Sequence, residues 1–395
     1  MNNINNDIYS DLGIRPIINC QGQRTMLGGS RLNNDVFESM KATNMSWSLI
    51  REVMEKASEY VAQHMGVEGA YITSGCAAAL ALSSAACITR KNPEHRGELP
   101  NSIGMRNEIL LQKKQKYSYD RAFTSTGGKL IYVGNENNCS KNDFVESIGP
   151  DTAALAYFVQ SPSDPTILSF EEVVEIGREY SIPVIADAAS QIYPIEYFLK
   201  IAQTADLVCF GGKFFGAPNS TGFVCGKKNL VDEVSEQGFI SFQTQLDGQR
   251  SIGRPMKMDR QSIIALVVAL KSWLTMNHED RILNNYNMLD FLQNKLRYIP
   301  HIKTKIITTE HFYGNSTMII EMDTEALGKT PQDVAVELDI SDPRIWIILP
   351  KGDFYGAEYL HYPGINSNSF AINTHALVDG EEKIVADRIK NILTL

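Results

Sequence analysis

Short apolar runs alternate with longer helical patterns through most of the chain. Apolar periodicity predicts helices at 49–64, 76–88, 170–180, 259–276 and 279–296. The runs that predict strands are 108–112, 129–133, 153–159, 183–186, 207–210 and 222–225. Several of these are continuously apolar, which is typical of strands covered by helices on both faces. The alternation predicts an α/β fold with a mostly parallel, doubly wound sheet.

The pattern changes after Pro300, which indicates a second, smaller α/β unit with its own core. Strands are predicted at 302–307, 316–322, 345–349 and 369–373, with helices near 331–338 and 380–393. The first residues do not make a domain and are expected to form an arm. The predicted division is therefore an arm at 1–45, a large domain at 46–298 and a small C-terminal α/β domain at 299–395.

Composition narrows the class of protein. The 395 residues are 43% hydrophobic and 21% charged, as in ordinary globular proteins. With 37 basic and 46 acidic residues the net charge is −9, which works against non-specific binding to nucleic acid or anionic membranes. The longest nearly apolar stretch, 77–88, is too short to span a bilayer. The N-terminus lacks the basic and apolar regions of a signal peptide, so we expect a cytoplasmic protein.

The cysteines and histidines do not suggest a metal site. The six cysteines are scattered without a CxxC pair, and the seven histidines include no HExxH. Because structural zinc sites use characteristic ligand spacings, we predict buried free thiols and no bound metal.

Three motifs are candidates for chemistry, and the first is an anion site. Residues 71–80 read YITSGCAAAL, so that Ser74, Gly75 and Cys76 form a turn that opens an alanine-rich helix. Free N–H groups at the positive end of a helix dipole can hold a phosphate. The alternative is a helix that packs through alanine and has an ordinary serine cap.

The second motif is a carboxylate at a strand end. The apolar run 183–186 ends in Asp187, followed by small residues. Ligands of open α/β sheets bind beyond the carboxyl ends of the strands, so Asp187 is predicted to point into that crevice. It could instead cap the following turn.

The third motif is a lysine among apolar residues. Residues 207–218 read LVCFGGKFFGAP and place Lys213 next to glycines and phenylalanines. Burial disfavours an ammonium and should lower the lysine pKa, which favours a neutral amine able to form a Schiff base. A surface lysine whose stem covers apolar neighbours is the alternative, and Phe210, Phe214 and Phe215 disfavour it.

Together these motifs match the needs of pyridoxal 5'-phosphate, which requires an anion site, an acid for the pyridine nitrogen and a lysine for the aldehyde. Lys213 follows Asp187 by 26 residues (213 − 187), at the end of the next predicted strand. The arrangement resembles a fold-type I pyridoxal-phosphate-dependent transferase. The expected cofactor contacts are Ser74, Gly75, Cys76, Asp187, Gln191, Lys213 and Gly253.

Further motifs resemble the SelA-like family, which contains L-seryl-tRNA(Sec) selenium transferase and D-glucosaminate-6-phosphate ammonia-lyase. The residues that carry this resemblance are Asn19–Gly22, Met26–Ser30, Tyr119–Ala122, Gly212–Lys213 with Gly216–Pro218, and Gly253–Lys257. The resemblance covers about residues 12 to 390. The ammonia-lyase side fits better, because the Gly-Arg-Pro-Met-Lys stretch and the chain length are similar and the tRNA-binding domain of the transferase is not found.

The sequence departs from the family pattern at two places. Gln115 stands where relatives have a histidine that can stack on the cofactor ring, and Gly211-Gly212 replaces a serine-containing stretch before the lysine. One phosphate contact could therefore come from a neighbouring subunit, since the resemblance implies a homodimer or larger oligomer. The loop of the 240s and 250s, with Gly253 and Arg254, is the candidate for that contact.

The resemblance implies a lyase that removes water and ammonia from a polar 2-amino-3-hydroxy acid, such as an amino-sugar acid, to give a 2-oxo acid. Lys213 would be the general base, and Asp187 would keep the ring nitrogen protonated. Arg121, Arg254 and Arg344 are candidate substrate ligands, because guanidinium binds carboxylates bidentately. The latter two could equally be structural.

Other functions stay open at this point. The alternatives are a selenium transferase acting on aminoacyl-tRNA, an aldolase or racemase, and a non-catalytic cofactor-binding protein. The lysines 113, 114 and 116 could bind a sugar phosphate, or they could form a solvated basic turn.

Overall fold

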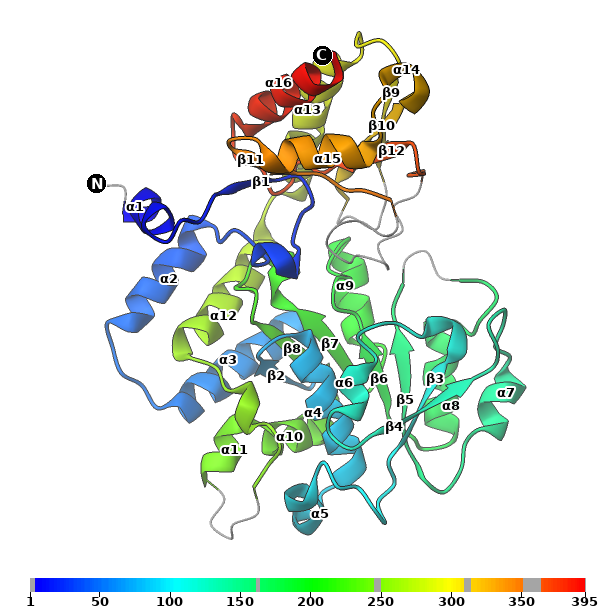
Figure 1. Ribbon diagram of the computed structural model, residues 1–395. Coiled ribbons are helices and arrows are strands. Elements are labelled where there is room, and N and C mark those ends of the chain that lie inside the picture. The colour runs from blue at the N-terminus through cyan, green and yellow to red at the C-terminus, as the bar shows by residue number, and fades with distance from the viewer. Residues whose placement is uncertain (1–3, 161–163, 245–249, 309–313, 351–363, 395) are drawn as a thin grey trace. The chain divides into compact units, whose positions relative to one another are not determined.

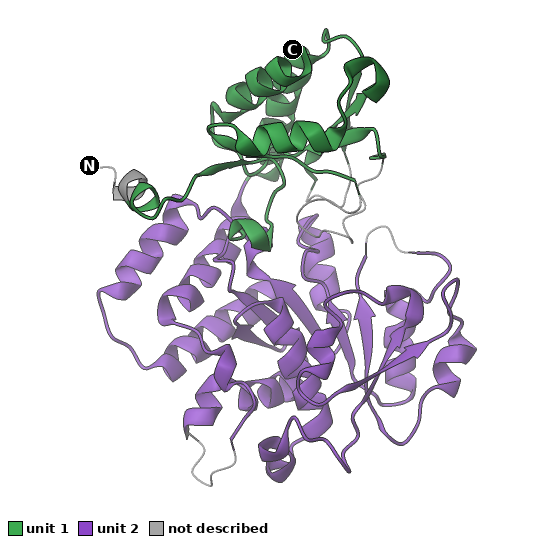
Figure 2. Ribbon diagram, viewed as in Figure 1, with its two compact units in different colours: residues 1–29, 277–395 green, residues 30–276 purple. Residues whose placement is uncertain are grey.

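The computed structural model describes residues 4–160, 164–244, 250–308, 314–350 and 364–394. The chain divides into two compact units, one of residues 30–276 and one of residues 1–29 with 277–395 (Figure 2). No helix within these described ranges is long and apolar enough to cross a membrane.

The larger unit is built on a seven-stranded sheet with the order β2-β8-β7-β6-β5-β3-β4 (Figure 1). Five neighbouring strands are parallel, and β8 runs antiparallel between β7 and β2. The strands are β2 (Gly69–Thr73), β3 (Glu108–Gln112), β4 (Lys129–Val133), β5 (Thr152–Phe158), β6 (Val184–Asp187), β7 (Leu207–Gly211) and β8 (Gly222–Gly226). The mostly parallel α/β sheet confirms the predicted fold class.

Helices cover both faces of this sheet. Because crossovers between parallel strands are right-handed, the β2–β3 connection through α4 lies on the face opposite to α8 and α9, which connect β5, β6 and β7. The helices of this unit are α2 (Asn34–Asn44), α3 (Ile50–Met65), α4 (Cys76–Thr89), α5 (Pro93–Glu98), α6 (Arg121–Thr124), α7 (Lys141–Glu146), α8 (Phe170–Glu179), α9 (Ile195–Ala202), α10 (Lys228–Glu236), α11 (Phe239–Thr244) and α12 (Arg260–Thr275). Short 3₁₀ turns are η2 (Lys113–Gln115), η3 (Gly212–Phe215) and η4 (Arg254–Met256).

Local capping explains where several helices begin. The Ser169 hydroxyl accepts the N–H of Glu172, and the Glu172 carboxylate accepts the N–H of Ser169, which makes a capping box at the start of α8. Asp259 caps α12 by accepting the N–H of Ser262 at 2.7 Å.

The smaller unit holds a three-stranded antiparallel sheet, β12-β10-β9, and a separate parallel pair, β1-β11. Its core joins apolar residues of these strands to α13, α15 and α16. The elements are α1 (Ile4–Asp11), β1 (Ile17–Asn19), η1 (Thr25–Leu27), α13 (His278–Leu296), β9 (Ile302–Thr308), β10 (Ser316–Met322), α14 (Thr324–Leu327), α15 (Pro331–Ile340), β11 (Arg344–Trp346), β12 (Ser369–Ile372) and α16 (Glu381–Thr394).

The two units divide the chain at 29/30 and 276/277, whereas the sequence suggested 45/46 and 298/299. The physical reason is that segments far apart in the sequence pair and pack with one another. β1 pairs with β11, so the first residues belong to the unit that also holds the C-terminal residues, and they are not a separate arm. Buried leucines of α13 belong to the same core as β10 and α16, so this helix joins that unit too.

Candidate active site

The candidate site lies at the carboxyl ends of the parallel strands of the larger unit. Asp187 is the last residue of β6 and pairs with Phe158 of β5 on one side and Cys209 of β7 on the other. Its side chain is buried, with 3% of the residue exposed. This is the crevice edge at which open α/β sheets bind ligands.

Lys213 lies in η3, directly after β7. Two backbone hydrogen bonds join the turn after β6 to the end of β7, from Ala188 N–H to the Cys209 carbonyl and from Gly211 N–H to the Ala189 carbonyl, each 3.0 Å. The segments that carry Asp187 and Lys213 are therefore tied together. The Lys213 side chain is partly buried, and its Nζ lies 5.0 Å from the centre of the Phe214 ring.

The two glycines before this lysine are required by close packing. A Cβ on Gly212 would lie 2.2 Å from Thr221 Oγ1, and one on Gly211 would lie 3.0 Å from the Phe214 ring. In this chain the Phe214 ring and Thr221 fill the space beside these two glycines.

Ser30 holds the lysine turn from outside the sheet. Its hydroxyl lies within hydrogen-bond distance of the Lys213 carbonyl and 3.2 Å from that of Ala217. Both carbonyls belong to the turn around η3, so this one side chain helps to fix the backbone of Lys213.

The N-terminus of α4 offers an uncapped anion cradle. Its N-cap residue is Gly75, at a φ of +113°, which no side chain caps. A Cβ built on Gly75 would meet nothing within 4 Å, so the space beside the turn is open. Ala77 in the first helical turn is exposed. The first N–H groups of this helix are therefore open to an anion, and phosphate binding by Ser74, Gly75 and Cys76 stays a prediction.

Asp187 receives only uncharged donors from the described residues. The Ala189 N–H donates to Oδ1 at 3.1 Å, Cys76 Sγ lies 3.6 Å from Oδ1, and the Tyr117 hydroxyl donates to Oδ2. Burial raises the pKa of Asp187, and these three hydrogen bonds oppose the rise. A buried carboxylate of this kind gains most from a cationic N–H donor, which is what a protonated pyridine nitrogen provides.

The thiol of Cys76 is held neutral in this site. Burial and the neighbouring Asp187 carboxylate raise its pKa well above the ordinary value. A neutral thiol is a weak hydrogen-bond donor. Cys76 therefore contributes a second donor to Asp187 Oδ1 besides its backbone N–H in the cradle.

Gln115, which occupies the place of the family histidine, is a buried structural residue here. Its amide donates to the Phe158 carbonyl at 2.8 Å and accepts the Phe158 N–H at 3.3 Å. The aromatic residue beside Asp187 is instead Tyr117, whose ring stacks on Phe158 with centroids 4.4 Å apart and planes at 10°. The sequence analysis did not identify Tyr117. The only feature that could have indicated it is its position two residues after Gln115, where relatives have the histidine.

The other predicted contacts are distributed more widely. The Gln191 amide donates to the Val159 carbonyl at 3.2 Å, beside the end of β5. Arg121 is exposed at the start of α6. The Arg254 guanidinium lies 5.9 Å from the Phe242 ring of α11, and a Cβ on Gly253 would meet the Gln237 carbonyl at 2.2 Å. Gly253 and Arg254 belong to the loop of the 240s and 250s, of which residues 245–249 lie outside the described residues.

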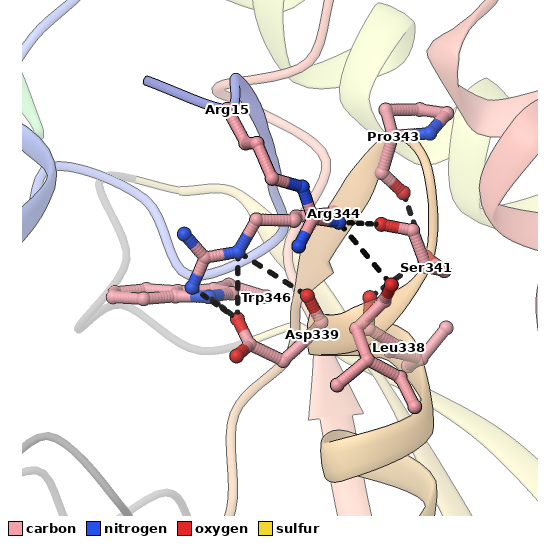
Figure 3. A network of polar contacts seen from close by, with 8 residues as sticks. Arg15, Leu338, Asp339, Ser341, Pro343, Arg344 and Trp346 are labelled. Atoms are coloured by element: carbon pink, nitrogen blue, oxygen red, sulfur yellow. Dashed lines mark hydrogen bonds and ion pairs between the residues drawn. The ribbon is translucent and has the colours of Figure 1, made fainter. Parts of the chain in front are cut away.

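Arg344 lies in the smaller unit, where a carboxylate already occupies its guanidinium (Figure 3). Its Nη2 and Nε lie 2.6 and 3.0 Å from Asp339 Oδ1, and Trp346 Nε1 donates to the same oxygen at 2.6 Å. Arg15 donates to the nearby carbonyls of Ile340 and Ser341. This network ties β11 to the end of α15, which favours the structural interpretation of Arg344.

The basic turn after β3 is largely paired. Lys113 lies 3.2 Å from Glu136, and Lys114 lies 2.7 Å from Asp164. Lys116 is exposed over the Tyr132 ring. All six cysteines are free thiols, and the described residues contain no group of three or more His, Cys, Asp or Glu side chains that could hold a metal.

Comparison with known proteins identifies relatives over nearly the whole chain. The family model of SelA, L-seryl-tRNA selenium transferase, matches residues 51–311. A 5'-C-glycyluridine monooxygenase-decarboxylase of Streptomyces sp is 28% identical over 98% of this chain and 92% of its own. The D-glucosaminate-6-phosphate ammonia lyase of Salmonella typhimurium is 26% identical over 98% of both chains. A solved structure of a D-glucosaminate-6-phosphate ammonia-lyase superposes with a TM-score of 0.81, at 23% identity over 98% of both chains.

Proposed function

Because the chain belongs to the SelA family of L-seryl-tRNA selenium transferases, we propose that it is a pyridoxal-phosphate-dependent lyase. In this proposal it removes water and ammonia from a polar 2-amino-3-hydroxy acid to give a 2-oxo acid. An amino-sugar acid such as D-glucosaminate or its 6-phosphate is the substrate class that we put first.

The family assignment confirms the predicted SelA-like membership, and with it the expectation of a fold-type I enzyme. Pyridoxal 5'-phosphate is the cofactor. The described residues suit this group, because they combine an open, uncapped helix N-terminus with a buried carboxylate that lacks a cationic partner among them.

Each residue has a separate task in the proposed reaction. The cofactor, when bound, supplies an electron sink for negative charge at the substrate Cα. Asp187 holds the proton on the ring nitrogen, because an ionised carboxylate stabilises a neighbouring cation. The N–H groups of α4 hold the phosphate. Lys213 would provide the amine that holds the cofactor aldehyde, and its amine would serve as the general base for the Cα proton.

The observation that carries the proposal is the Asp187 carboxylate beside the Lys213 turn, in a chain similar to the ammonia lyase over 98% of both. Net release of ammonia balances the reaction, since the water lost from the β-carbon is regained when the enamine product hydrolyses. Arg121 and Arg254 are proposed substrate ligands.

We further propose a homo-oligomer in which Gly253 and Arg254 serve a neighbouring site. Arg250 and Arg254 both lie over the Phe242 ring, at 5.2 and 5.9 Å. Neither takes part in an ion pair with another described residue. Guanidinium groups bind carboxylates and phosphates bidentately, so these two side chains are suited to an anion from another molecule.

The test is a substrate screen on purified holoenzyme. Hydroxy-amino acids and aminosugar acids, with and without a phosphate, are assayed for ammonia and 2-oxo acid in equal amounts. Lys213→Ala is the control, and it should abolish both turnover and borohydride attachment of the pyridoxyl group. Continued attachment in Lys213→Ala would show that another lysine binds the cofactor, and exchange of the Cα proton without ammonia would indicate a racemase or aldolase.

A second candidate function is an oxygen-dependent decarboxylation. It is favoured by the 28% identity to a monooxygenase-decarboxylase over almost the whole chain. An oxygen electrode separates the two proposals, because the lyase releases ammonia at the same rate under nitrogen and in air. Consumption of dioxygen with release of carbon dioxide would overturn the lyase. Strong, salt-dependent retention of tRNA would instead favour the selenium transferase.

A further inference from the structure

Tyr117 contacts both Asp187 and the residue next to it in the sheet, Phe158. Its hydroxyl donates to Asp187 Oδ2, and its ring stacks on Phe158, which is the registered neighbour of Asp187 on β5. Gln115 clamps the Phe158 backbone through two hydrogen bonds. The ring of Tyr117 therefore rests on a fixed surface, and its hydroxyl is aimed at one oxygen of the carboxylate.

The Tyr117 hydroxyl stays protonated in this setting. Burial and the Asp187 carboxylate raise its pKa above the ordinary value, with smaller contributions from Cys76 and Asp120. A tyrosine that does not ionise is a permanent hydrogen-bond donor. Asp120 itself accepts a hydrogen bond from the Tyr132 hydroxyl at 2.7 Å, so it has a donor of its own.

The hydrogen bonds from described residues do not use all the lone pairs of the Asp187 carboxylate. Ala189 N–H and the Cys76 thiol use Oδ1, and Tyr117 uses one side of Oδ2. A carboxylate has about four lone-pair sites. One site on Oδ2 is thus left for a cationic donor, while the tyrosine fixes the rotation of the group.

We propose that Tyr117 is a positioning residue for Asp187, whose hydroxyl keeps this buried carboxylate ionised and oriented toward the cationic ring nitrogen of the cofactor. The inference rests on the proposed function. It gives Tyr117 a task beyond filling space, because a phenylalanine would stack on Phe158 equally well and would leave the carboxylate with one donor fewer.

Among the described residues, the titratable groups that face this pair come from α4, β7, η3 and the turn after β3, where the Tyr119 ring also lies 6.2 Å from that of Tyr117. Cys76 from α4 and Tyr117 from the turn after β3 contact Asp187 directly. Cys209 of β7 and Lys213 act on Cys76, and Asp120 acts on Tyr117. Among the groups in direct contact only the tyrosine hydroxyl can be deleted without altering the cradle, because Cys76 belongs to α4.

The experiment compares cofactor binding by three proteins over a range of pH. Apoprotein of the wild type, Tyr117→Phe and Tyr132→Phe is titrated with pyridoxal phosphate, followed by absorbance and by circular dichroism of the bound cofactor. Tyr132→Phe is the matched control, since it removes a tyrosine hydroxyl from a different aspartate. We expect Tyr117→Phe to weaken binding about tenfold or more, and Tyr132→Phe to change it less than about twofold.

The pH dependence gives a second readout. Without its tyrosine donor the carboxylate should take up a proton at a higher pH, so the pH below which the cofactor is released should move upward in Tyr117→Phe. A purely structural role of Tyr117 would lower the melting temperature of the apoprotein without moving this midpoint. Unchanged affinity and midpoint in Tyr117→Phe would overturn the inference.

A double-mutant cycle with Asp187→Asn separates this inference from the proposed function. If Tyr117 acts through Asp187, the effect of Tyr117→Phe on cofactor affinity should fall below about twofold in the Asp187→Asn protein. An equally large effect in both backgrounds would also overturn it. The proposed function is tested independently by borohydride attachment at Lys213, so an unaltered Tyr117→Phe would leave that function standing.

Discussion

Two aspartates, one in each unit, show opposite ways of keeping a carboxylate inside a protein. Asp339 of the smaller unit has its cation in the chain, since Arg344 and the Trp346 indole both donate to Oδ1. Asp187 of the larger unit is more deeply buried, and its partners among the described residues are a hydroxyl, a thiol and a backbone N–H. The first network has its cation within the fold, whereas for the second we propose that the bound cofactor supplies it.

The presence or absence of a cationic partner within the fold separates a structural carboxylate from a candidate functional one. The residue type does not, because both are aspartates. Both aspartates lie at or next to the last residue of a regular element. What separates them is whether the fold itself supplies the opposite charge. A buried carboxylate without a cation costs stability, so its presence indicates a ligand that repays the cost when it binds.

The largest effect is expected for Asp187→Asn. It should lower turnover about 10²- to 10³-fold, because an amide cannot stabilise the protonated ring nitrogen. The free energy of unfolding of the apoprotein should stay equal or rise, since no buried charge remains to be satisfied. Steady-state rates and denaturant unfolding measure the two effects.

The matched change in the other unit is Asp339→Asn, which should reverse this pattern. Loss of stability with unaltered turnover is expected there. If both asparagine variants lost stability and kept activity, the contrast between the two aspartates would be wrong.

An intermediate effect is expected for Arg344→Ala. The side chains of this ion pair are only 25% and 31% exposed. Loss of Arg344 removes two N–H donors from Asp339 and should lower the free energy of unfolding by about 1–3 kcal/mol. Arg388→Ala is the control, because this arginine donates to a backbone carbonyl from an exposed position. A large rise in KM with no loss of stability would instead make Arg344 a ligand of the substrate carboxylate.

The smallest effect is a pH dependence of the cofactor-free protein. Burial raises the pKa of Asp187 above 3.8, so the folded chain keeps a proton that the unfolded chain has lost. Stability should therefore fall as the pH rises from about 3.8 through the raised value. The free energy of unfolding of the wild type minus that of Asp187→Asn should change by about 1.4 kcal/mol for each pH unit between the unfolded-state and folded-state pKa of Asp187. A difference that is constant with pH would contradict this account of Asp187.

Much of the fold could be predicted from the sequence where an element is long or continuously apolar. The strands 108–112, 129–133 and 316–322 have the predicted bounds, and the helices α3, α4, α8, α12 and α13 begin and end within about two residues of prediction. The elements that were missed are short or weakly patterned. β1 has three residues, and its partner β11 lies more than 300 residues away in the chain.

Two other elements that the sequence did not predict, β2 and α2, also depend on contacts with distant segments of the chain. β2 is not among the predicted strands, although it pairs antiparallel with β8 at the sheet edge. α2 is mostly exposed, with Val36 as its one buried residue, so it lacks a strong apolar stripe. In both cases the stabilising contacts come from distant parts of the chain, which local periodicity does not report.

The sequence by itself determined which chemical groups this protein has and in what order: a small-residue turn, an acid at the end of one strand and a lysine at the end of the next. That order implied the cofactor, because strand ends in an open α/β sheet meet at one edge. Only the tertiary structure decided which neighbours these groups have. Tyr117 and not Gln115 reaches Asp187, and Arg344 is paired with Asp339. The physical reason is that hydrogen bonding and burial depend on distances between segments far apart in the chain, and these distances follow from packing.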